Sequence, residues 1–319
     1  MPGQTSLVRP LAVVAFGGNA LLGPDDDGTV AEQRLRAEAA AYWLAEFARR
    51  DHDMVIVHGN GPQVGQVLIQ MEEAATKIPP STLDVAVAAT EGSVGFLLET
   101  ALRNRFALAG IAREVVTLLS LVVVDREDAG FANPSKPVGP FFPRSRAEML
   151  EREHGWPMIE DSGRGWRRVV ASPRPLEVLG VPALRDLLAH GHVVIAGGGG
   201  GIPVLRDSGV VCGVEAVIDK DRTAALLARE LRADLLIILT GVPQVVKNFG
   251  KKSARPLPRL SVREARRLLA EGQFPPGSMG PKIEAAADFV EATQKPAVIT
   301  DIEHLPEALD RRNGTWLVA

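Results

Sequence analysis

The sequence is almost without cysteine, and its one cysteine among 319 residues, Cys212, excludes an intrachain disulfide. It also lacks an excess of either charge, because its acids and bases are interspersed and its formal net charge at pH 7 is -3. Neither a basic field for nucleic acid nor a polybasic membrane patch is therefore expected. Long hydrophobic runs are missing as well, since the apolar run at residues 11–16 is too short for a membrane span or a signal peptide. These absences predict a cytoplasmic protein with no nucleic-acid partner and no membrane partner.

Several common catalytic motifs are absent too. Five consecutive glycines occupy residues 197–201, but Ile202 follows them where the P-loop of ATPases has lysine and then serine or threonine. No Gly-x-Ser-x-Gly pattern of a serine hydrolase is present. His190 and His192 have no cysteine or carboxylate close to them in the sequence, so they do not indicate a metal site. The sequence therefore predicts no metal held by protein side chains.

What the sequence does contain is an alternation of apolar strands and amphipathic helices. Short, β-branched segments predict strands at residues 11–16, 54–57, 115–116, 122–124, 192–195, 235–239 and 297–299. Between them, apolar residues repeat on one helical face in three segments. These faces are Leu35, Ala39, Tyr42, Trp43 and Phe47; Ala224, Leu227, Ala228 and Leu231; and Ile283, Ala286, Ala287 and Val290. The order predicts a doubly wound α/β fold with a mostly parallel, buried central sheet.

Residues 125–165 interrupt this alternation. The segment is rich in proline, glycine and charge, and it contains one short predicted helix near residues 146–152. It is either a solvated connection or an inserted subdomain. We favour an inserted lid subdomain, because structureless loops of this length are uncommon in compact domains unless they are functional.

Three glycine-rich turns follow predicted strands. The first contains Gly17, Gly18 and Asn19, the second contains Gly59, Asn60 and Gly61, and the third is the run at residues 197–201. Ligands of open parallel sheets bind at the carboxyl ends of the strands, where helix N-termini present unsatisfied N–H groups. Glycine lets the backbone approach a phosphate closely. One such turn is ordinary turn chemistry, whereas three in one chain indicate phosphate binding.

Lysine is scarce, and three of the eight lysines lie in unusual positions. Lys136, Lys220 and Lys282 occur in loops or at helix starts beside glycine, proline or aspartate. A solvated surface position is the alternative for any one of them. Phosphoryl transfer, however, requires positioning and neutralisation of charge, to which lysine point charges are suited. Two unit charges about 4 Å apart interact by about 4 kcal/mol at an effective dielectric constant of about 20, so Asp221 could hold two of these lysines in register.

Eight segments, in order along nearly the whole chain, resemble carbamate kinases, a branch of the amino acid kinase superfamily. They are AFGGNALL, VHGNGPQVG, NPSKPVGPFF, RRVVASPRP, IAGGGGGIPV, EAVIDKDRTAALLA, NFGK and PGSMGPKIEAA. The resemblance implies the reaction ATP + carbamate = ADP + carbamoyl phosphate, which makes ATP in arginine or agmatine catabolism. It further implies a three-layer αβα sandwich and a homodimer. Mg²⁺ is expected to arrive with the nucleotide, bound by phosphates and water.

The same resemblance implies roles for individual residues. The catalytic residues would be Lys136 at the carbamoyl phosphate end, Lys220 and Lys282 on the nucleotide phosphates, and Asp221 as their organiser. The first two glycine turns would hold the transferred phosphoryl group, and Gly198, Gly199 and Gly200 would pass close to it or to carbamate. The nucleotide would contact Asp219, Thr240, Val242, Asn248, Phe249, Met279 and Gly280. Residues 1–213 would form the substrate and dimerisation lobe, and residues 214–319 the nucleotide lobe.

Three residues depart from the usual pattern of that family. Glu91 stands where glutamine is common, Phe142 where tyrosine is common, and Pro243 where an acidic residue is common. Pro243 and Phe142 bear on nucleotide contacts and lid packing, and Glu91 has no evident place. Two alternatives stay open, namely another small-acid kinase of the same fold and a nucleotide-binding sensor without catalysis.

Overall fold

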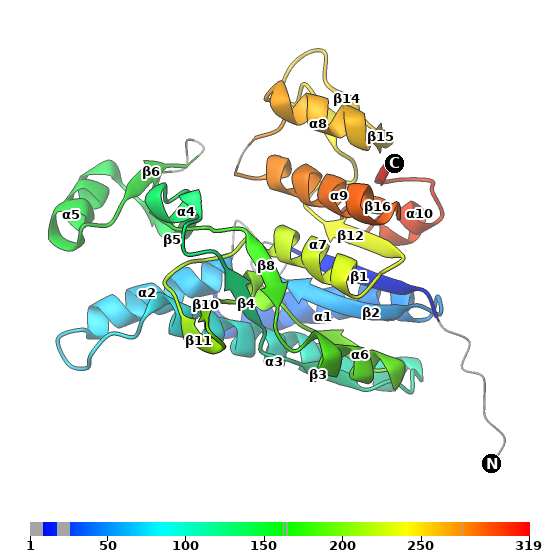
Figure 1. The fold of residues 1–319 in the computed structure, drawn as a ribbon, viewed down its shortest axis with the longest axis horizontal. Helices are drawn as coiled ribbons and strands as arrows, with labels where there is room; N and C mark the ends of the chain where they lie inside the picture. Colours follow the sequence, from blue (N-terminus) through cyan, green and yellow to red (C-terminus); the bar gives the residue numbers. More distant parts are fainter. Residues whose placement is uncertain (1–8, 18–25, 162, 164, 276) are drawn as a thin grey trace.

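The computed structural model describes residues 9–17, 26–161, 163, 165–275 and 277–319 of the chain. Its centre is an eight-stranded sheet with the strand order β15-β17-β16-β12-β1-β2-β9-β3 (Figure 1). Neighbouring strands are parallel except β16 and β17, which are antiparallel. The strands are β1 (Leu11–Phe16), β2 (Asp53–His58), β3 (Val115–Thr117), β9 (Val193–Ile195), β12 (Leu235–Leu239), β15 (Arg259–Ser261), β16 (Ala297–Thr300) and β17 (Thr315–Val318). The predicted α/β fold with a mostly parallel sheet is confirmed.

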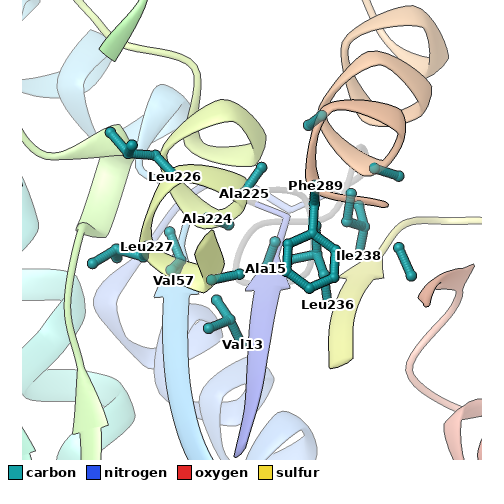
Figure 2. Close-up of a cluster of buried hydrophobic side chains, with 14 of the residues drawn as sticks. Val13, Ala15, Val57, Ala224, Ala225, Leu226, Leu227, Leu236, Ile238 and Phe289 are labelled. Atoms are coloured by element: carbon teal, nitrogen blue, oxygen red, sulfur yellow. The ribbon is translucent and has the colours of Figure 1, made fainter. Parts of the chain in front are cut away.

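Helices cover both faces of this sheet. One face carries α1 (Val30–Ala48), α3 (Leu83–Ala109) and α10 (Leu305–Leu309), and the other carries α6 (Val181–Ala189), α7 (Lys220–Glu230), α8 (Val262–Ala270) and α9 (Met279–Thr293). Successive side chains of a strand point to opposite faces, so β1 sends Val14 into the first layer and Val13 and Ala15 into the second. Figure 2 shows α7 and α9 packed over Val13 and Ala15. The molecule is thus the expected three-layer αβα sandwich.

The sequence predicted the buried faces of two helices correctly and that of a third only in part, since Phe47 of α1 is buried as predicted. On α7 and α9 every predicted position is buried. On α1, however, Leu35 is 65% exposed and Tyr42 is 42% exposed, whereas Ala37, Ala41 and Leu44 are buried. This helix packs closely against α3, and small side chains allow that approach. Leu35 and Tyr42 therefore face outward, and a stripe of alanines together with Leu44 and Phe47 faces the core.

A second, four-stranded sheet lies beside the first, with the order β11-β10-β4-β8. Its strands are β4 (Leu121–Val124), β8 (Pro175–Val178), β10 (Ile202–Asp207) and β11 (Val210–Gly213). The segment predicted at residues 122–124 therefore pairs here and not in the main sheet. The chain passes from the main sheet to this one between β3 and β4 and again between β9 and β10. The glycines at residues 197–201 make the second passage.

The inserted segment forms a folded subdomain in place of a solvated connection (Figure 1). It contains α4 (Ala129–Ala132), β5 (Lys136–Phe142), α5 (Arg144–His154), β6 (Met158–Glu160) and β7 (Trp166–Val170), and its three strands form an antiparallel sheet. Leu150 and Met158 form a small core, against which Phe142 and Trp166 pack. The subdomain extends past the expected limit at residue 165, because β7 is its central strand.

The subdomain rests on α2 (Gly61–Ala74) through two glycines. A Cβ placed on Gly65 of α2 would overlap the Cα of Gly139 in β5. Gly139 also has a φ of +80°, a conformation that favours glycine. This close crossing sets the position of β5, whose first residue is Lys136.

Among the described helices, α3 is the one long and apolar enough to cross a membrane by length and composition. Half of its most apolar window is buried inside the protein, and the helix packs against α1. A core helix meets the same criteria, and the packing of α3 is that of a core helix.

Candidate active site

The three glycine turns meet at the carboxyl edge of the main sheet. They follow β1, β2 and β9, which are adjacent parallel strands. The N–H of Gly59 donates to the last carbonyl of β1 at 2.8 Å, and Gly199 lies directly against the side chain of Asn60. Gly18 and Asn19 of the first turn lie outside the described residues. The fold therefore brings the predicted turns together at the edge where ligands of parallel sheets bind.

The second turn leads into the N-terminus of α2, which has no side-chain cap. Asn60 precedes the helix, but its Nδ2 donates to Thr90 Oγ1 at 2.9 Å instead of meeting the helix end. Gly61 begins the helix and faces open space, because a Cβ placed there would meet no atom within 4 Å. The uncapped start of a helix carries partial positive charge, so this end of α2 is suited to an anion.

Residues 197–201 require glycine for backbone conformation and for space. Four of the five glycines have a φ between +66° and +98°. A Cβ on Gly199 would overlap the side chain of Asn60, and a Cβ on Gly200 would overlap the carbonyl of Ile218. The turn is buried, and the atoms around it fix its shape.

Most N–H groups of this turn bond inside the protein. Gly197 donates to Ser120 Oγ at 2.7 Å. Gly198 donates to Glu91 Oε1 at 2.9 Å, and the last two glycines donate to carbonyls of the turn itself. For the N–H of Gly199 no partner is found among the described residues. Gly199 is therefore the glycine of this turn that is best able to donate to a ligand.

Three lysines from distant segments converge on two aspartates. Lys136 Nζ, which comes from the inserted subdomain, lies 2.6 Å from Asp219 Oδ2. Lys220 Nζ, at the start of α7, lies 2.6 Å from Asp221 Oδ1, and Lys282 Nζ on α9 lies 2.8 Å from Asp221 Oδ2. Asp221 thus holds two lysines in register, as the sequence suggested. These five residues are called the lysine cluster below.

The lysines of this cluster make its two carboxylates more acidic than usual. Asp219 is the N-cap of the helix, and its Oδ1 accepts from the backbone N–H of Asp221 at 2.9 Å. Burial would raise the pKa of Asp219, but the ammonium groups of Lys136 and Lys220 outweigh it and hold that pKa well below its usual range. Lys220 and Lys282 lower the pKa of Asp221 in the same way against burial. Both carboxylates are therefore ionised at neutral pH.

The two nucleotide-side lysines differ in their proton affinity. Burial lowers the pKa of Lys220 to about 8, although the neighbouring Asp221 partly offsets the shift. Burial acts on Lys282 too, but the charge and hydrogen bond of Asp221 outweigh it and raise the pKa of Lys282. Near neutral pH Lys282 is fully charged, and Lys220 is charged but within reach of its titration.

Two of the predicted nucleotide residues follow the end of β12. Thr240 comes directly after this strand, and Val242 lies half-buried in the loop beyond it. A Cβ on Gly17 would lie 3.7 Å from the carbonyl oxygen of Leu239 at the end of β12. Thr240 is therefore close to the first glycine turn. Pro243 lies exposed in the same loop.

The other predicted nucleotide residues divide between α9 and a hairpin. Met279 and Gly280 begin α9, less than one turn before Lys282. Asn248 and Phe249 follow β13 (Val246–Lys247), which pairs with β14 (Arg255–Pro256), and Phe249 is 71% exposed. Among the described residues, neither shares a hydrogen bond or ion pair with the lysine cluster. The start of α9 thus lies beside the lysine cluster, whereas Asn248 and Phe249 make no hydrogen bond or ion pair with it among the described residues.

Three side chains that support the third turn were not recognised as such from the sequence. Thr223 Oγ1 donates to the carbonyl of Gly200 at 2.8 Å, and Ser120 and Glu91 accept from the glycine N–H groups. Thr223 lies one helical turn after Lys220, a position that could have drawn attention to it. Ser120 lies in an ordinary loop, where no sequence signal marks it.

The described part of the chain contains no group of three or more histidine, cysteine, aspartate or glutamate side chains suited to a metal ion. His190 and His192 stack with ring centroids 6.2 Å apart. Nδ1 of His190 lies 2.7 Å from the carbonyl oxygen of Asp186, one turn earlier on α6. The contacts of His190 and His192 are therefore those of residues at the end of a helix and in the loop that follows it.

Comparison with known proteins matches residues 10–301 to the amino acid kinase family. A carbamate kinase of Thermococcus kodakarensis is 44% identical over 309 residues, which cover 96% of this chain and 98% of that protein. One from Pyrococcus horikoshii is 43% identical and covers 95% and 97%. A carbamate kinase-like protein of Escherichia coli, YahI, is 44% identical and covers 98% and 99%.

Solved structures agree with these relatives. A carbamate kinase from Giardia lamblia bound to AMP-PNP superposes with a TM-score of 0.89 at 38% identity, covering 97% of this chain and 98% of that one. An aspartate kinase from Synechocystis shares the fold alone, with a TM-score of 0.54 at 17% identity over 97% of this chain and 40% of that one.

Proposed function

The chain belongs to the amino acid kinase family, and we infer that it is a carbamate kinase, an ATP-dependent enzyme that transfers a phosphoryl group to carbamate. The observation that carries this inference is the lysine cluster at the glycine turns. In this cluster three ammonium groups are paired with two carboxylates, beside the uncapped start of α2 and the N–H of Gly199, which has no partner among the described residues.

The reaction requires the protein to position groups and neutralise charge. In the direction of ATP formation, a β-phosphate oxygen of ADP attacks the phosphorus of carbamoyl phosphate, and the bond from phosphorus to the carbamoyl oxygen breaks. Carbamate leaves with the electron pair, so no proton transfer is needed. Catalysis of such a transfer rests on alignment and electrostatic stabilisation. We propose that this direction supplies ATP in arginine or agmatine catabolism.

Each member of the lysine cluster has a role in this proposal. Lys220 and Lys282 neutralise the nucleotide phosphates and the phosphoryl group in transit, and Asp221 keeps their ammonium groups together. Asp221 is too acidic to accept a proton at neutral pH, so it acts as an organiser and not as a base. Lys136 enters from the subdomain and binds the carbamoyl phosphate end, while Asp219 orients it.

The glycine turns would surround the transferred group. Gly17, Gly59 and Gly61 allow the backbone to approach it, and the N–H of Gly199 donates to one of its oxygens. Gly18 and Asn19 complete the first turn in this proposal, although they lie outside the described residues. Preorganised backbone donors of this kind stabilise charge that develops in the transition state.

The nucleotide would lie along the other lobe. Thr240 and Val242 after β12, and Met279 and Gly280 at the start of α9, form a wall for the adenine and ribose in this proposal, to which the hairpin residues Asn248 and Phe249 add an outer side. Mg²⁺ arrives as part of the substrate, bound by the nucleotide phosphates and by water. In this arrangement residues 1–213 hold the carbamate side and residues 214–319 the nucleotide side.

We further propose a cytoplasmic homodimer. Large apolar side chains lie exposed on α3, on the second sheet and in the loop before β4, namely Phe96, Leu119, Leu121, Val210 and Val211. These elements are neighbours, and Leu119 Cδ2 would lie 3.9 Å from a Cβ on Gly92, one turn before Phe96 on α3. Exposed apolar side chains on neighbouring elements are typical of a protein interface. A second copy of the chain is the occupant that we propose.

A coupled assay of ATP formation from ADP and carbamoyl phosphate tests the proposed function. We expect ATP to form with carbamoyl phosphate and not with acetyl phosphate at the same concentration. Binding of ADP without turnover would instead identify a nucleotide sensor. Equal turnover with acetyl phosphate would identify a less selective small-acid kinase.

A further inference from the structure

Glu91 is a buried carboxyl group that joins helix α3 to the third glycine turn. Its side chain is part of a residue that is only 1% exposed. Oε1 accepts two backbone hydrogen bonds, from Gly198 at 2.9 Å and from Ser120 at 3.2 Å, although these residues are far apart in the sequence. Among the described residues, Oε2 has no hydrogen-bond partner. The carboxyl group of Glu91 thus bonds to both connections between the two sheets, the one between β3 and β4 and the one between β9 and β10.

Ser120 extends this connection to the neighbouring glycine. Its Oγ accepts from Gly197 at 2.7 Å and donates to the carbonyl of Leu118 at 3.2 Å. Its own carbonyl accepts from Ile202 at 2.8 Å, just after the turn. Ser120 and Glu91 therefore accept hydrogen bonds from the successive N–H groups of Gly197 and Gly198.

Gly198 is enclosed between two titratable side chains that are neutral at pH 7. A Cβ on Gly198 would overlap the ring of His58 and lie 2.9 Å from Glu91 Cγ. Burial lowers the pKa of His58 to about 4 and raises the pKa of Glu91 to about 8. Neither group places a charge beside the glycine turn at neutral pH. The carboxyl group of Glu91 then serves as a hydrogen-bond acceptor and not as an anion.

The bonds at Gly197 and Gly198 decide the orientation of the next peptide. With both N–H groups directed at Ser120 and Glu91, the turn continues with Gly199 at a φ of +69°, where its N–H has no partner among the described residues. Without the acceptor at Glu91, the N–H of Gly198 would be buried and unsatisfied, which favours reorientation of the turn. A misplaced donor costs rate because transition-state stabilisation depends on its preorganised position.

We propose that Glu91 is a positioning residue for phosphoryl transfer, which acts through Gly198 to aim the N–H of Gly199 at the transferred group. This inference rests on the proposed carbamate kinase activity. Glu91 itself touches no substrate in this account. What it contributes is the acceptor oxygen at Oε1.

Two substitutions of Glu91 distinguish the loss of its hydrogen-bond acceptor from a change in side-chain volume. Glu91→Gln keeps an acceptor oxygen at the same place, whereas Glu91→Met keeps a similar length without any acceptor. We expect Glu91→Met to lower kcat by about 10- to 100-fold with the Kd for ADP unchanged, because the lysines of the nucleotide side are untouched. Glu91→Gln should restore kcat to within about threefold of the unmodified enzyme.

Leu98→Val is the matched control, because it changes a fully buried position two turns along the same helix without touching the turn. It should leave kcat unchanged even where it lowers the melting temperature. If Glu91→Met does not fold, Ser120→Ala removes the adjacent acceptor and should lower kcat by about tenfold. A kcat for Glu91→Met equal to that of Glu91→Gln would overturn the proposal.

Amide hydrogen exchange of residues 192–204 provides a readout that does not depend on activity. Glu91→Met should speed exchange of the Gly198 amide, and Glu91→Gln should not. Unchanged exchange in Glu91→Met would refute the positioning role whether or not the enzyme turns over. An inactive unmodified enzyme with the expected exchange pattern would instead count against the proposed function alone.

Discussion

Asp221 accepts hydrogen bonds from two lysines, and Asp219 accepts one from a third. The cluster contains three ammonium groups and two carboxylates, so its net charge is 3 - 2 = +1 while all five groups are ionised. Pairing makes the burial of these charges tolerable, because an unpaired buried charge is strongly destabilising. The remaining positive charge favours an incoming phosphate. The same residues thus pair with one another within the fold and attract a phosphate ligand.

Lys282→Ala tests the charge contributed by α9. Removal of one preorganised donor of positive charge should lower kcat for ATP formation by about 10²- to 10³-fold while the fold is retained. Lys77→Ala, at an exposed lysine after α2, is the control and should leave kcat unchanged. Steady-state kinetics with circular dichroism would measure both. Equal rates in the two variants would remove Lys282 from the catalytic residues.

The pH dependence of ADP use should report the titration of Lys220. Its pKa of about 8 means that the ammonium form dominates below this pH and the neutral amine above it. Because only the charged form neutralises phosphate, kcat/KM for ADP should fall above pH 8, by about tenfold per pH unit. Bound phosphates favour the charged form, so the decline in kcat should occur at higher pH than the decline in kcat/KM. A flat kcat/KM between pH 7 and pH 9.5 would contradict this role.

At the scale of elements, the site depends on how the subdomain rests on α2. Lys136 begins β5, and β5 crosses α2 where Gly65 meets Gly139. Close approach of two backbones leaves no room for a methyl group. The crossing therefore determines how far Lys136 reaches toward Asp219.

Gly65→Ala should displace β5 and with it the ammonium group of Lys136. We expect the KM for carbamoyl phosphate to rise by about tenfold or more, with the KM for ADP little changed, since misplacement by about 1 Å can cost 10²-fold in rate. Gly92→Ala is the matched control, because it is also a helical glycine but a Cβ there would meet only Leu119 Cδ2 at 3.9 Å. A similar effect on both substrates would indicate general destabilisation instead.

At the scale of the whole molecule, the exposed apolar face on α3 and the second sheet is the feature that the single chain leaves unexplained. Phe96 is 58% exposed, Leu119 59% and Val210 69%. Exposed apolar side chains that gather on adjacent elements are costly in water, and association covers them. The turn that holds Gly199 connects directly to β10 of this second sheet. The proposed interface would therefore be continuous with the support of the site.

Phe96→Glu should convert the dimer to a monomer. The unmodified chain should sediment at about twice its own mass of 34.1 kDa, and the variant at that mass, because burying an unpaired charge in an apolar interface is costly. Leu35→Glu changes an equally exposed leucine on α1 and should not alter the mass. Analytical ultracentrifugation would measure all three proteins. A monomeric unmodified chain would refute the proposed homodimer.

The sequence by itself determined which segments form the main sheet's central strands, and it supplied the residues that we propose to carry the chemistry. Strand residues 11–16 and 235–239 were predicted to the residue, because short β-branched runs between turn residues are a local signal. The glycine turns and the three lysines were also recognisable from local context, and the phosphate chemistry followed from their residue types.

Only the tertiary structure decided how these parts meet. Lys282 and Asp221 are 61 residues apart, Lys136 and Asp219 are 83 apart, and Glu91 and Gly198 are 107 apart. No local pattern encodes such pairs, since each depends on which strands lie side by side. For the same reason the alanines on the buried face of α1 were missed, because close packing against α3 favours small side chains there while periodicity gives weight to large ones. The sequence supplies the chemical groups, and long-range packing determines their distances, partners and charge.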